Sequence, residues 1–301
     1  MSWTAFFLIL VSVFLHAGWN FMCKSKRASM AFYLLTALSA VVLLSPFPLL
    51  CRIEWSTLPA RFRLLLLASG CCEVLYNYGL FRAYRHNDIS LAYPLVRALP
   101  VLMTAGVTIL LGLGRAPGML SLFGMGVVSA GCLLIPLKRW SEFRPKSYFT
   151  PALRFILLAA LCTTGYTIFD SLAAPLLAEH SDSSDLLRAG TYLFWCEIIM
   201  SIGIGFFVIR SRKERGEFRR LFLRSPYPVL CGAFSSAAYI LVLIAMLFVT
   251  NVSYIQAFRQ MSLPIGVFAG IVLLHENRSP IKLTGVALLV AGLLLVALGQ
   301  S

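Results

Sequence analysis

The sequence predicts an all-α integral membrane protein with ten transmembrane helices in two inverted five-helix repeats. Three observations carry this prediction: the composition, the spacing of the polar breaks, and motifs that recur in both halves. The 301 residues are 59% hydrophobic and 13% charged, with a mean hydropathy of +0.84. Soluble domains are about 45–50% apolar and about 25% charged. A single soluble core cannot bury this excess of apolar side chains, so lipid is the expected surrounding.

The expected spans follow from the positions of the polar breaks. About 20 mostly apolar residues are needed to cross the roughly 30 Å of bilayer hydrocarbon. Windows of this kind lie at 3–22, 30–50, 62–81, 89–111 and 118–137 in the first half, and at 151–177, 187–209, 227–249, 252–274 and 281–298 in the second. The longest breaks, 138–150 and 210–226, leave no room for a soluble domain. Pro94 and Pro100 in the fourth window and Pro264 in the ninth allow a kink or hinge, and they equally fit tolerated bends without a gating role.

The two halves, 1–145 and 146–301, carry related motifs. Five crossings reverse the side on which the second unit begins, so two such units are inserted with opposite orientation. Inverted repeats are typical of secondary transporters, whose substrate site lies near the bilayer midplane between the repeats. The related positions are Asn87 with Asn251, Arg97 with Arg259, Gly124 and Gly131 with Gly285 and Gly292, and Gly18-Trp19-Asn20 with Gly165-Tyr166-Thr167.

The net charge of +14 does not predict a nucleic-acid partner, because the Lys and Arg residues lie in short segments between spans. Cytoplasmic loops carry such an excess, and its distribution favours both chain termini outside the cytoplasm. The eight cysteines include no C-x-x-C pair, and most lie inside apolar windows. Neither a disulfide framework nor a metal site is therefore predicted.

Five ionisable residues lie inside the expected spans. An ionisable side chain at the bilayer centre costs about 2.5–3.5 kcal/mol on insertion scales, so five facing lipid would cost on the order of 10 kcal/mol. They are therefore expected to face the interior of the bundle. These residues are Glu73, Arg97, Asp170, Glu197 and Arg259.

Polar and aromatic residues one helical turn from these charges share a helix face with them. This pattern predicts a water-filled cavity in which carboxylates and guanidinium groups hold the two ends of a zwitterionic or cationic solute. Tyr166, for example, lies four residues before Asp170. The candidate substrate-binding residues are His16, Trp19, Asn20, Glu73, Tyr76, Asn77, Tyr93, Arg97, Tyr166, Asp170, Tyr239, Gln256 and Arg259.

Structural roles stay open for several of these side chains. Arg97 and Arg259 lie near helix starts and equally fit ion pairs or snorkelling residues. His16 also fits a packing histidine, and Trp19 fits a core or interfacial aromatic residue. Glu197 fits an interhelical polar contact better than a ligand contact, and it is not among the candidates.

The sequence has no G-x-G-x-x-G, P-loop, H-E-x-x-H or G-x-S-x-G motif, and each of these would mark a known catalytic or nucleotide-binding site. We therefore expect a protein without enzymatic activity or cofactor, driven by a solute or ion gradient. The alternative is a membrane-embedded enzyme for a lipid-linked or small polar substrate, with Glu73, Asp170 and His16 as acid–base groups. A membrane scaffold or sensor is a third reading.

Three segments carry a family resemblance: HAGWN at 16–20, followed by Lys24; NDISLAYPLVRALP at 87–100; and NVSYIQAFRQMS at 251–262. In this order they resemble the drug/metabolite transporter superfamily, and more narrowly its ten-span EamA-type permeases. Glu276, nine residues before Gly285, is similar to the acidic residue common near the end of an EamA domain. The first half departs from this pattern, because Arg115 stands nine residues before Gly124.

The resemblance implies a secondary carrier or exporter of small metabolites in the inner (plasma) membrane, with a cavity between two EamA-like units. Members of the family handle amino acids, nucleotide-type compounds and drugs, and the HAGWN start is similar to a subgroup associated with phosphonate utilisation. An amino-acid-like or aminophosphonate-like solute is thus implied. Family members usually have cytoplasmic termini, contrary to the charge distribution. Both a monomer and a homodimer fit the sequence.

Overall fold

The computed structural model describes the backbone of residues 2–24, 29–53, 55–86, 89–137, 139–142, 153–273 and 278–300. It describes their side chains as well, except those of 20–24, 84–86, 89–94 and 273. Within these ranges the regular structure is helical, and no strand is present. The all-α class predicted from the composition is therefore confirmed.

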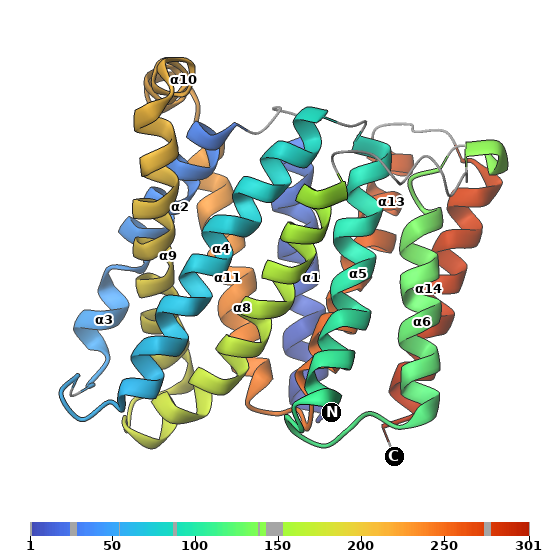
Figure 1. The fold of residues 1–301 in the computed structure, drawn as a ribbon, viewed down its shortest axis with the longest axis horizontal. Coiled ribbons are helices and arrows are strands. Elements are labelled where there is room, and N and C mark those ends of the chain that lie inside the picture. The colour runs from blue at the N-terminus through green and yellow to red at the C-terminus, as the bar shows by residue number, and fades with distance from the viewer. Residues whose placement is uncertain are drawn as a thin grey trace.

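The helices form an elongated bundle, seen from the side in Figure 1. Both chain termini lie at one end of the bundle, and α10 lies across the opposite end. In chain order the helices are α1 (Trp3–Lys24), α2 (Met30–Leu44), α3 (Pro46–Leu50), α4 (Ala60–His86), α5 (Ile89–Leu110), α6 (Met119–Leu134), η1 (Trp140–Glu142), α8 (Leu153–Glu179), α9 (Asp185–Arg210), α10 (Arg212–Arg224), α11 (Tyr227–Met246), α12 (Val252–Phe258), η2 (Arg259–Met261), α13 (Ser262–Leu273) and α14 (Pro280–Leu298).

Seven segments of the described chain are long and apolar enough to cross a membrane: Met30–Leu50, Ala60–Ala83, Leu153–Glu179, Asp185–Arg210, Tyr227–Met246, Val252–Val272 and Pro280–Leu298. The other three expected spans coincide with shorter apolar stretches, Trp3–Trp19, Leu95–Leu110 and Met119–Leu134. Large apolar side chains point outward from the bundle; Phe123, Ile202 and Phe268 are each at least 66% exposed. This surface indicates a multi-pass membrane protein, because exposing so much apolar area to water would be energetically unfavourable.

The closest helix pair, α6 with α14, depends on glycine. A Cβ atom added at Gly131 would lie 2.7 Å from the carbonyl oxygen of Gly285, and one added at Gly292 would lie 2.8 Å from that of Gly124. Such distances are shorter than a side-chain carbon tolerates, so any larger residue would push the two backbones apart. Between helices in lipid there is no hydrophobic driving force, so association depends on close van der Waals contact, which small residues at the crossing allow.

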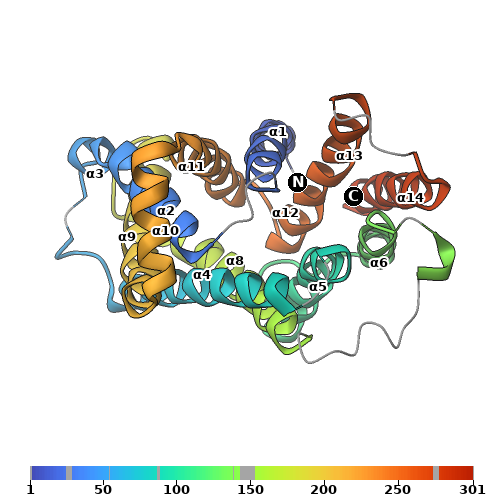
Figure 2. The same ribbon diagram turned by 90° about the horizontal axis from the view of Figure 1, so that it is seen from above.

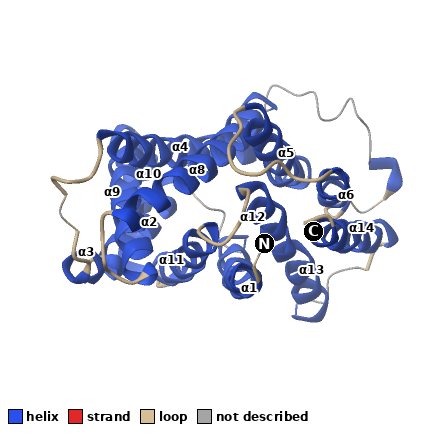
Figure 3. Cartoon of the chain, turned by 90° about the horizontal axis from the view of Figure 1, so that it is seen from below, coloured by secondary structure: helices blue, strands red, loops and turns tan. Residues whose placement is uncertain are grey.

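Helices from one half pack mainly against helices from the other. α4 packs against α8, α1 against α11, and α2 against α9. α11 also packs against α2, and α9 against α4. Viewed along the helices, α6 and α14 lie side by side at one lateral edge of the bundle, and α3 lies at the opposite edge (Figures 2 and 3). The interior between the halves is thereby enclosed by helices of both.

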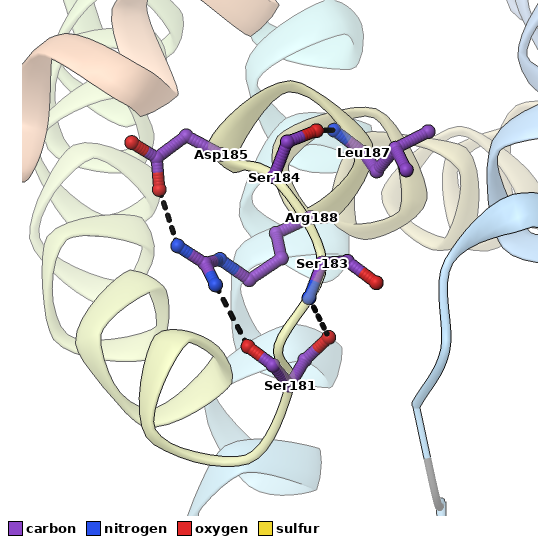
Figure 4. A network of polar contacts seen from close by, with 6 residues as sticks. All are labelled: Ser181, Ser183, Ser184, Asp185, Leu187 and Arg188. Carbon is purple, nitrogen blue, oxygen red and sulfur yellow. Dashed lines mark hydrogen bonds and ion pairs between the residues drawn. The ribbon is translucent and has the colours of Figure 1, made fainter.

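The start of α9 is fixed by a local polar network (Figure 4). The hydroxyl oxygen of Ser184 accepts a hydrogen bond from the N–H of Leu187 at 3.4 Å, which satisfies one of the free N–H groups of the first helical turn. The guanidinium group of Arg188 donates to the carbonyl oxygen of Ser181 at 2.7 Å and also pairs with Asp185. The α8–α9 loop is therefore tied to the helix that it precedes.

We expect Gly131→Leu to lower the free energy of unfolding by about 1–3 kcal/mol, the usual cost of overpacking. The measurement is the apparent Tm of the purified protein in detergent. Gly126→Leu on the same helix is the matched control, because a Cβ at Gly126 meets nothing within 4 Å. Equal losses of Tm in both variants would contradict the role assigned to the α6–α14 contact.

Candidate functional site

A cavity lies between the two halves of the chain, with about 160 Å³ open to the centres of water molecules. Its walls come from α1, α2, α4 and α5 in the first half and from α8, α9, α11, α12 and η2 in the second. Ten of the candidate residues line it: His16, Trp19, Glu73, Tyr76, Asn77, Arg97, Tyr166, Tyr239, Gln256 and Arg259. Side chains separated by much of the sequence are thereby brought to one place.

Arg259 is positioned by a break in the ninth expected span. α12 ends at Phe258, the 3-10 turn η2 covers Arg259–Met261, and α13 follows. Pro264 has no N–H, so an α-helix would leave the carbonyl group of Gln260 without its partner, and the backbone tightens just before this point. The α-helix is therefore interrupted just before Pro264, where Arg259 and Gln260 enter the cavity wall. The helix α5, which contains Pro94 and Pro100, is not interrupted.

Arg97 and Arg259 are connected through one serine. The Nη2 of Arg97 donates to the Oγ of Ser262 at 2.5 Å. The same hydroxyl group donates to the carbonyl oxygen of Arg259 at 3.0 Å. The two repeat-related arginines thus lie in one polar network on the side of the cavity formed by α5 and η2.

His16 lies between two groups that donate hydrogen bonds and cannot accept them. The indole Nε1 of Trp19 donates to Nδ1 of His16 at 2.9 Å, and Nη1 of Arg97 lies 3.3 Å from Nε2 of His16. A neutral imidazole that accepts at Nδ1 carries its proton on Nε2, so the N–H of His16 faces the N–H of Arg97. An acceptor atom placed beside both groups would satisfy them together. A carboxylate or phosphonate oxygen has this property.

Asp170 was predicted to bind substrate, and it is not among the side chains that line the cavity. The residue is 0% exposed. Its Oδ1 accepts from the hydroxyl group of Tyr192 at 2.7 Å and from that of Ser69, and its Oδ2 accepts from the hydroxyl group of Tyr239. These donors come from α9, α4 and α11, whereas the expected neighbour on α8 was Tyr166. Because an ionised carboxylate can only accept, three hydroxyl donors suit it well.

Tyrosine rings form a continuous aromatic side of the cavity. The rings of Tyr76 and Tyr166 meet edge to face at 6.1 Å between centroids, and those of Tyr166 and Tyr239 do so at the same distance. The guanidinium carbon of Arg259 lies 5.4 Å from the ring centroid of Tyr239, within the range of a cation–π contact. Asp170 therefore fixes Tyr239 through its hydroxyl group, and the ring of Tyr239 in turn contacts Arg259.

Glu73 on α4 and Glu197 on α9 bring two carboxyl groups to the cavity. Within the described side chains, Oε2 of each glutamate is buried without a hydrogen-bond partner, and so are Oε1 of Gln256 and Nη1 of Arg259. Buried polar atoms are normally paired, and in the described lining Oγ1 of Thr36 and Oε1 of Gln260 are unmatched as well. The two glutamates and Arg259 form no ion pair with one another. Glu197, expected to be an interhelical contact, belongs to the lining.

The remaining candidates divide into one structural contact and two positions that cannot be placed. Asn77 lines the cavity, and its Nδ2 donates to the backbone oxygen of Glu73 at 2.9 Å instead of to the carboxylate. Asn20 and Tyr93 lie outside the residues whose side chains are described.

Besides Glu197, sequence reasoning missed six polar side chains of the lining: Ser12, Tyr33, Thr36, Thr163, Ser235 and Gln260. Gln260 had a usable signal, because it stands four residues after Gln256, and its Nε2 donates to the carbonyl oxygen of Gln256 at 3.1 Å. The serines and threonines had none, since Ser and Thr occur throughout the apolar helices.

Comparisons with known proteins bear on the fold. No family model and no curated protein matches the chain. Among solved structures 29 chains match, and one of them, described as "Crystal structure of protein", is 15% identical with a TM-score of 0.71 over 98% of this chain and 98% of its own. The two chains therefore share a fold over nearly their full lengths.

We expect Asp170→Ala to lower the Tm more than Tyr192→Phe does. The first change leaves three buried hydroxyl groups without their acceptor, at about 1–3 kcal/mol for each unsatisfied group, whereas the second removes one donor, at about 1 kcal/mol. Tyr254→Phe is the control, since Tyr254 is 4% exposed and lies outside this cluster. Thermal unfolding in detergent distinguishes them, and an unchanged Tm for Asp170→Ala would contradict the cluster's structural role.

Proposed function

We propose that the chain is a gradient-driven secondary transporter or exporter of a small polar metabolite, working by alternating access between two inverted five-helix units. The observation that carries the proposal is the cavity between the halves, whose lining combines two arginines with two glutamates. The family resemblance supports the same class, the drug/metabolite transporters of EamA type in the inner membrane. On this proposal the ten apolar helices are ten spans.

Reciprocal contacts between the halves support the inverted repeat. Gly18 of α1 lies against the ring of Phe234 of α11, and Gly165 of α8 lies against Cys72 of α4. Gly18 and Gly165 are repeat-related positions, and Cys72 and Phe234 stand 162 residues apart, the interval that also separates the two arginines. Exchanging the units thus converts one contact into the other, as a pseudo-two-fold axis requires.

The glycine contacts of α6 and α14 have the same property. Gly124 meets Gly292, and Gly285 meets Gly131. Gly124 corresponds to Gly285 in the repeat, and Gly131 to Gly292. Exchanging the two units therefore returns the same pair of contacts, which supports a pseudo-two-fold axis between these two helices.

The polar atoms of the cavity support a zwitterionic solute. The facing N–H groups of Arg97 and His16, together with Nη1 of Arg259, suit an anionic group. The unpaired Oε2 atoms of Glu73 and Glu197 suit a cationic group. A volume of 160 Å³ holds on the order of ten water molecules, which is the scale of an amino-acid-like or aminophosphonate-like solute. We propose that the anionic end binds beside Arg97 and the ammonium group beside the glutamates.

A membrane-embedded enzyme using Glu73, Asp170 and His16 is the less favoured reading. It requires the three groups to meet at one water-accessible point. Both oxygens of Asp170 accept hydroxyl donors behind the cavity wall, so this carboxylate is engaged in holding helices together. Glu73 and His16 fit a binding role in the proposed transporter.

The transport proposal is tested by flux into liposomes that contain the purified protein. Labelled amino acids and aminophosphonates form the panel, and we expect at least one to cross above the protein-free rate. Glu73→Gln and Arg259→Gln should each lower that flux about tenfold or more, because a lost charge-assisted contact costs about 1.5–3 kcal/mol. Folding is checked by gel filtration.

Arg115→Gln is the matched control, because Arg115 is exposed outside the cavity. Flux indistinguishable from empty liposomes over the whole panel, with folded protein, would overturn the transport proposal. Chemical conversion of a solute, detected by mass spectrometry, would favour the enzyme instead.

The proposed orientation places the α10 end of the bundle in the cytoplasm. α10 carries six Lys and Arg residues, and loops rich in these residues stay on the cytoplasmic side. Both termini then lie outside, since they are at the other end of the bundle (Figure 1). We expect alkaline phosphatase fused after Ser301 to be active and green fluorescent protein fused there to be dark. The opposite pattern would support the cytoplasmic termini implied by the family resemblance.

A further inference from the structure

α10 (Arg212–Arg224) lies across the end of the bundle, over α2 and α9 (Figures 1 and 2). It follows directly on α9, which ends at Arg210, and α11 begins at Tyr227, three residues after α10 ends. Both neighbours are candidate membrane spans. α10 is therefore held close to the boundary between hydrocarbon and water.

Contacts with the bundle fix how α10 is turned about its axis. The carboxylate of Glu214 is buried and accepts from the N–H of Ala31, at the start of α2, at 3.0 Å. An acidic group there also suits the positive end of the α2 dipole. Phe218 packs against the cluster that includes Met30 and Ile204. The face of α10 that carries Glu214 and Phe218 thus points toward the protein.

The other face of α10 is cationic. Glu217 pairs with Arg220 at 2.5 Å, so both acidic residues of the helix are engaged. The exposed basic residues are Arg212, Lys213, Arg215, Arg219, Arg220 and Arg224. Phe222 and Leu223 lie among them and are 69% and 77% exposed. Exposed cations with exposed large apolar side chains on one short helix are typical of helices that lie in a membrane interface.

We propose that α10 is a docking surface for anionic phospholipid. Lipid phosphate groups bind the Lys and Arg side chains of α10, and Phe222 and Leu223 enter the adjoining acyl region. Basic residues next to a span attract anionic headgroups in this way. The position of α10 between two candidate membrane spans favours lipid over a nucleic acid. The proposal stands apart from the transport function.

The test measures retention of lipid by the full-length protein in neutral detergent. Phosphatidylglycerol and phosphatidylcholine with identical acyl chains are supplied in equal amounts, and bound lipid is counted by native mass spectrometry. We expect phosphatidylglycerol to be retained in preference. In K213Q/R219Q/R224Q that preference should fall about tenfold or vanish, since each cation near the surface contributes to the attraction.

The matched control is R61Q/R63Q/R115Q, which removes the same charge from exposed arginines outside α10 and should leave the preference unchanged. F222S/L223S should lower retention of both lipids and keep the preference between them. The proposal is overturned by equal retention of the two lipids in the unmodified protein, or by equal losses in the α10 and control variants. Displacement of the lipid by millimolar glycerol phosphate would likewise overturn it in favour of a soluble phosphate site.

Discussion

Three hydroxyl groups from three helices donate to the buried carboxylate of Asp170, and the rest of the cavity depends on this cluster. Ser69, Tyr192 and Tyr239 belong to α4, α9 and α11, so one side chain of α8 joins four helices from both halves. A charge buried in an apolar bundle is stable when its acceptor atoms are satisfied. The same bond that satisfies Asp170 orients the ring against which Arg259 lies.

In contrast to the oxygens of Asp170, several buried polar atoms of the cavity lining have no hydrogen-bond partner in the described protein. Glu73 and Glu197 each keep a buried oxygen without a hydrogen-bond partner, and Arg259 keeps a buried nitrogen, Nη1, without one. Unpaired polar atoms are costly inside a protein, and they cluster where a ligand completes their hydrogen bonds. On the transport function proposed above, we expect such a site to reject solutes that lack one of the two charges, since such a solute would leave half of these atoms unsatisfied.

Packing between the halves supplies the frame for both arrangements. Helices in lipid gain little from apolar contact, so glycines at crossings and buried hydrogen bonds set their positions. α6 and α14 meet through glycines, away from the polar cavity, whereas α4, α8, α9 and α11 meet around Asp170. The halves therefore meet through two different kinds of interface, a tight glycine contact between α6 and α14 and a polar cluster around Asp170.

The sequence by itself determined the helical membrane class, the approximate spans and the need for the ionisable residues to face inward, because hydropathy is local and the cost of a charge in lipid does not depend on the fold. Ten of the thirteen candidate residues line the cavity. The tertiary structure decided their partners. Asp170 binds hydroxyl groups of other helices and not Tyr166 one turn away, and Glu197 lines the cavity, because the rotation of each helix about its axis is set by neighbours distant in sequence. The helix break at Arg259 was predictable in part. Pro264 in the sequence indicates the break, but the cavity that Arg259 lines forms only when both halves have packed.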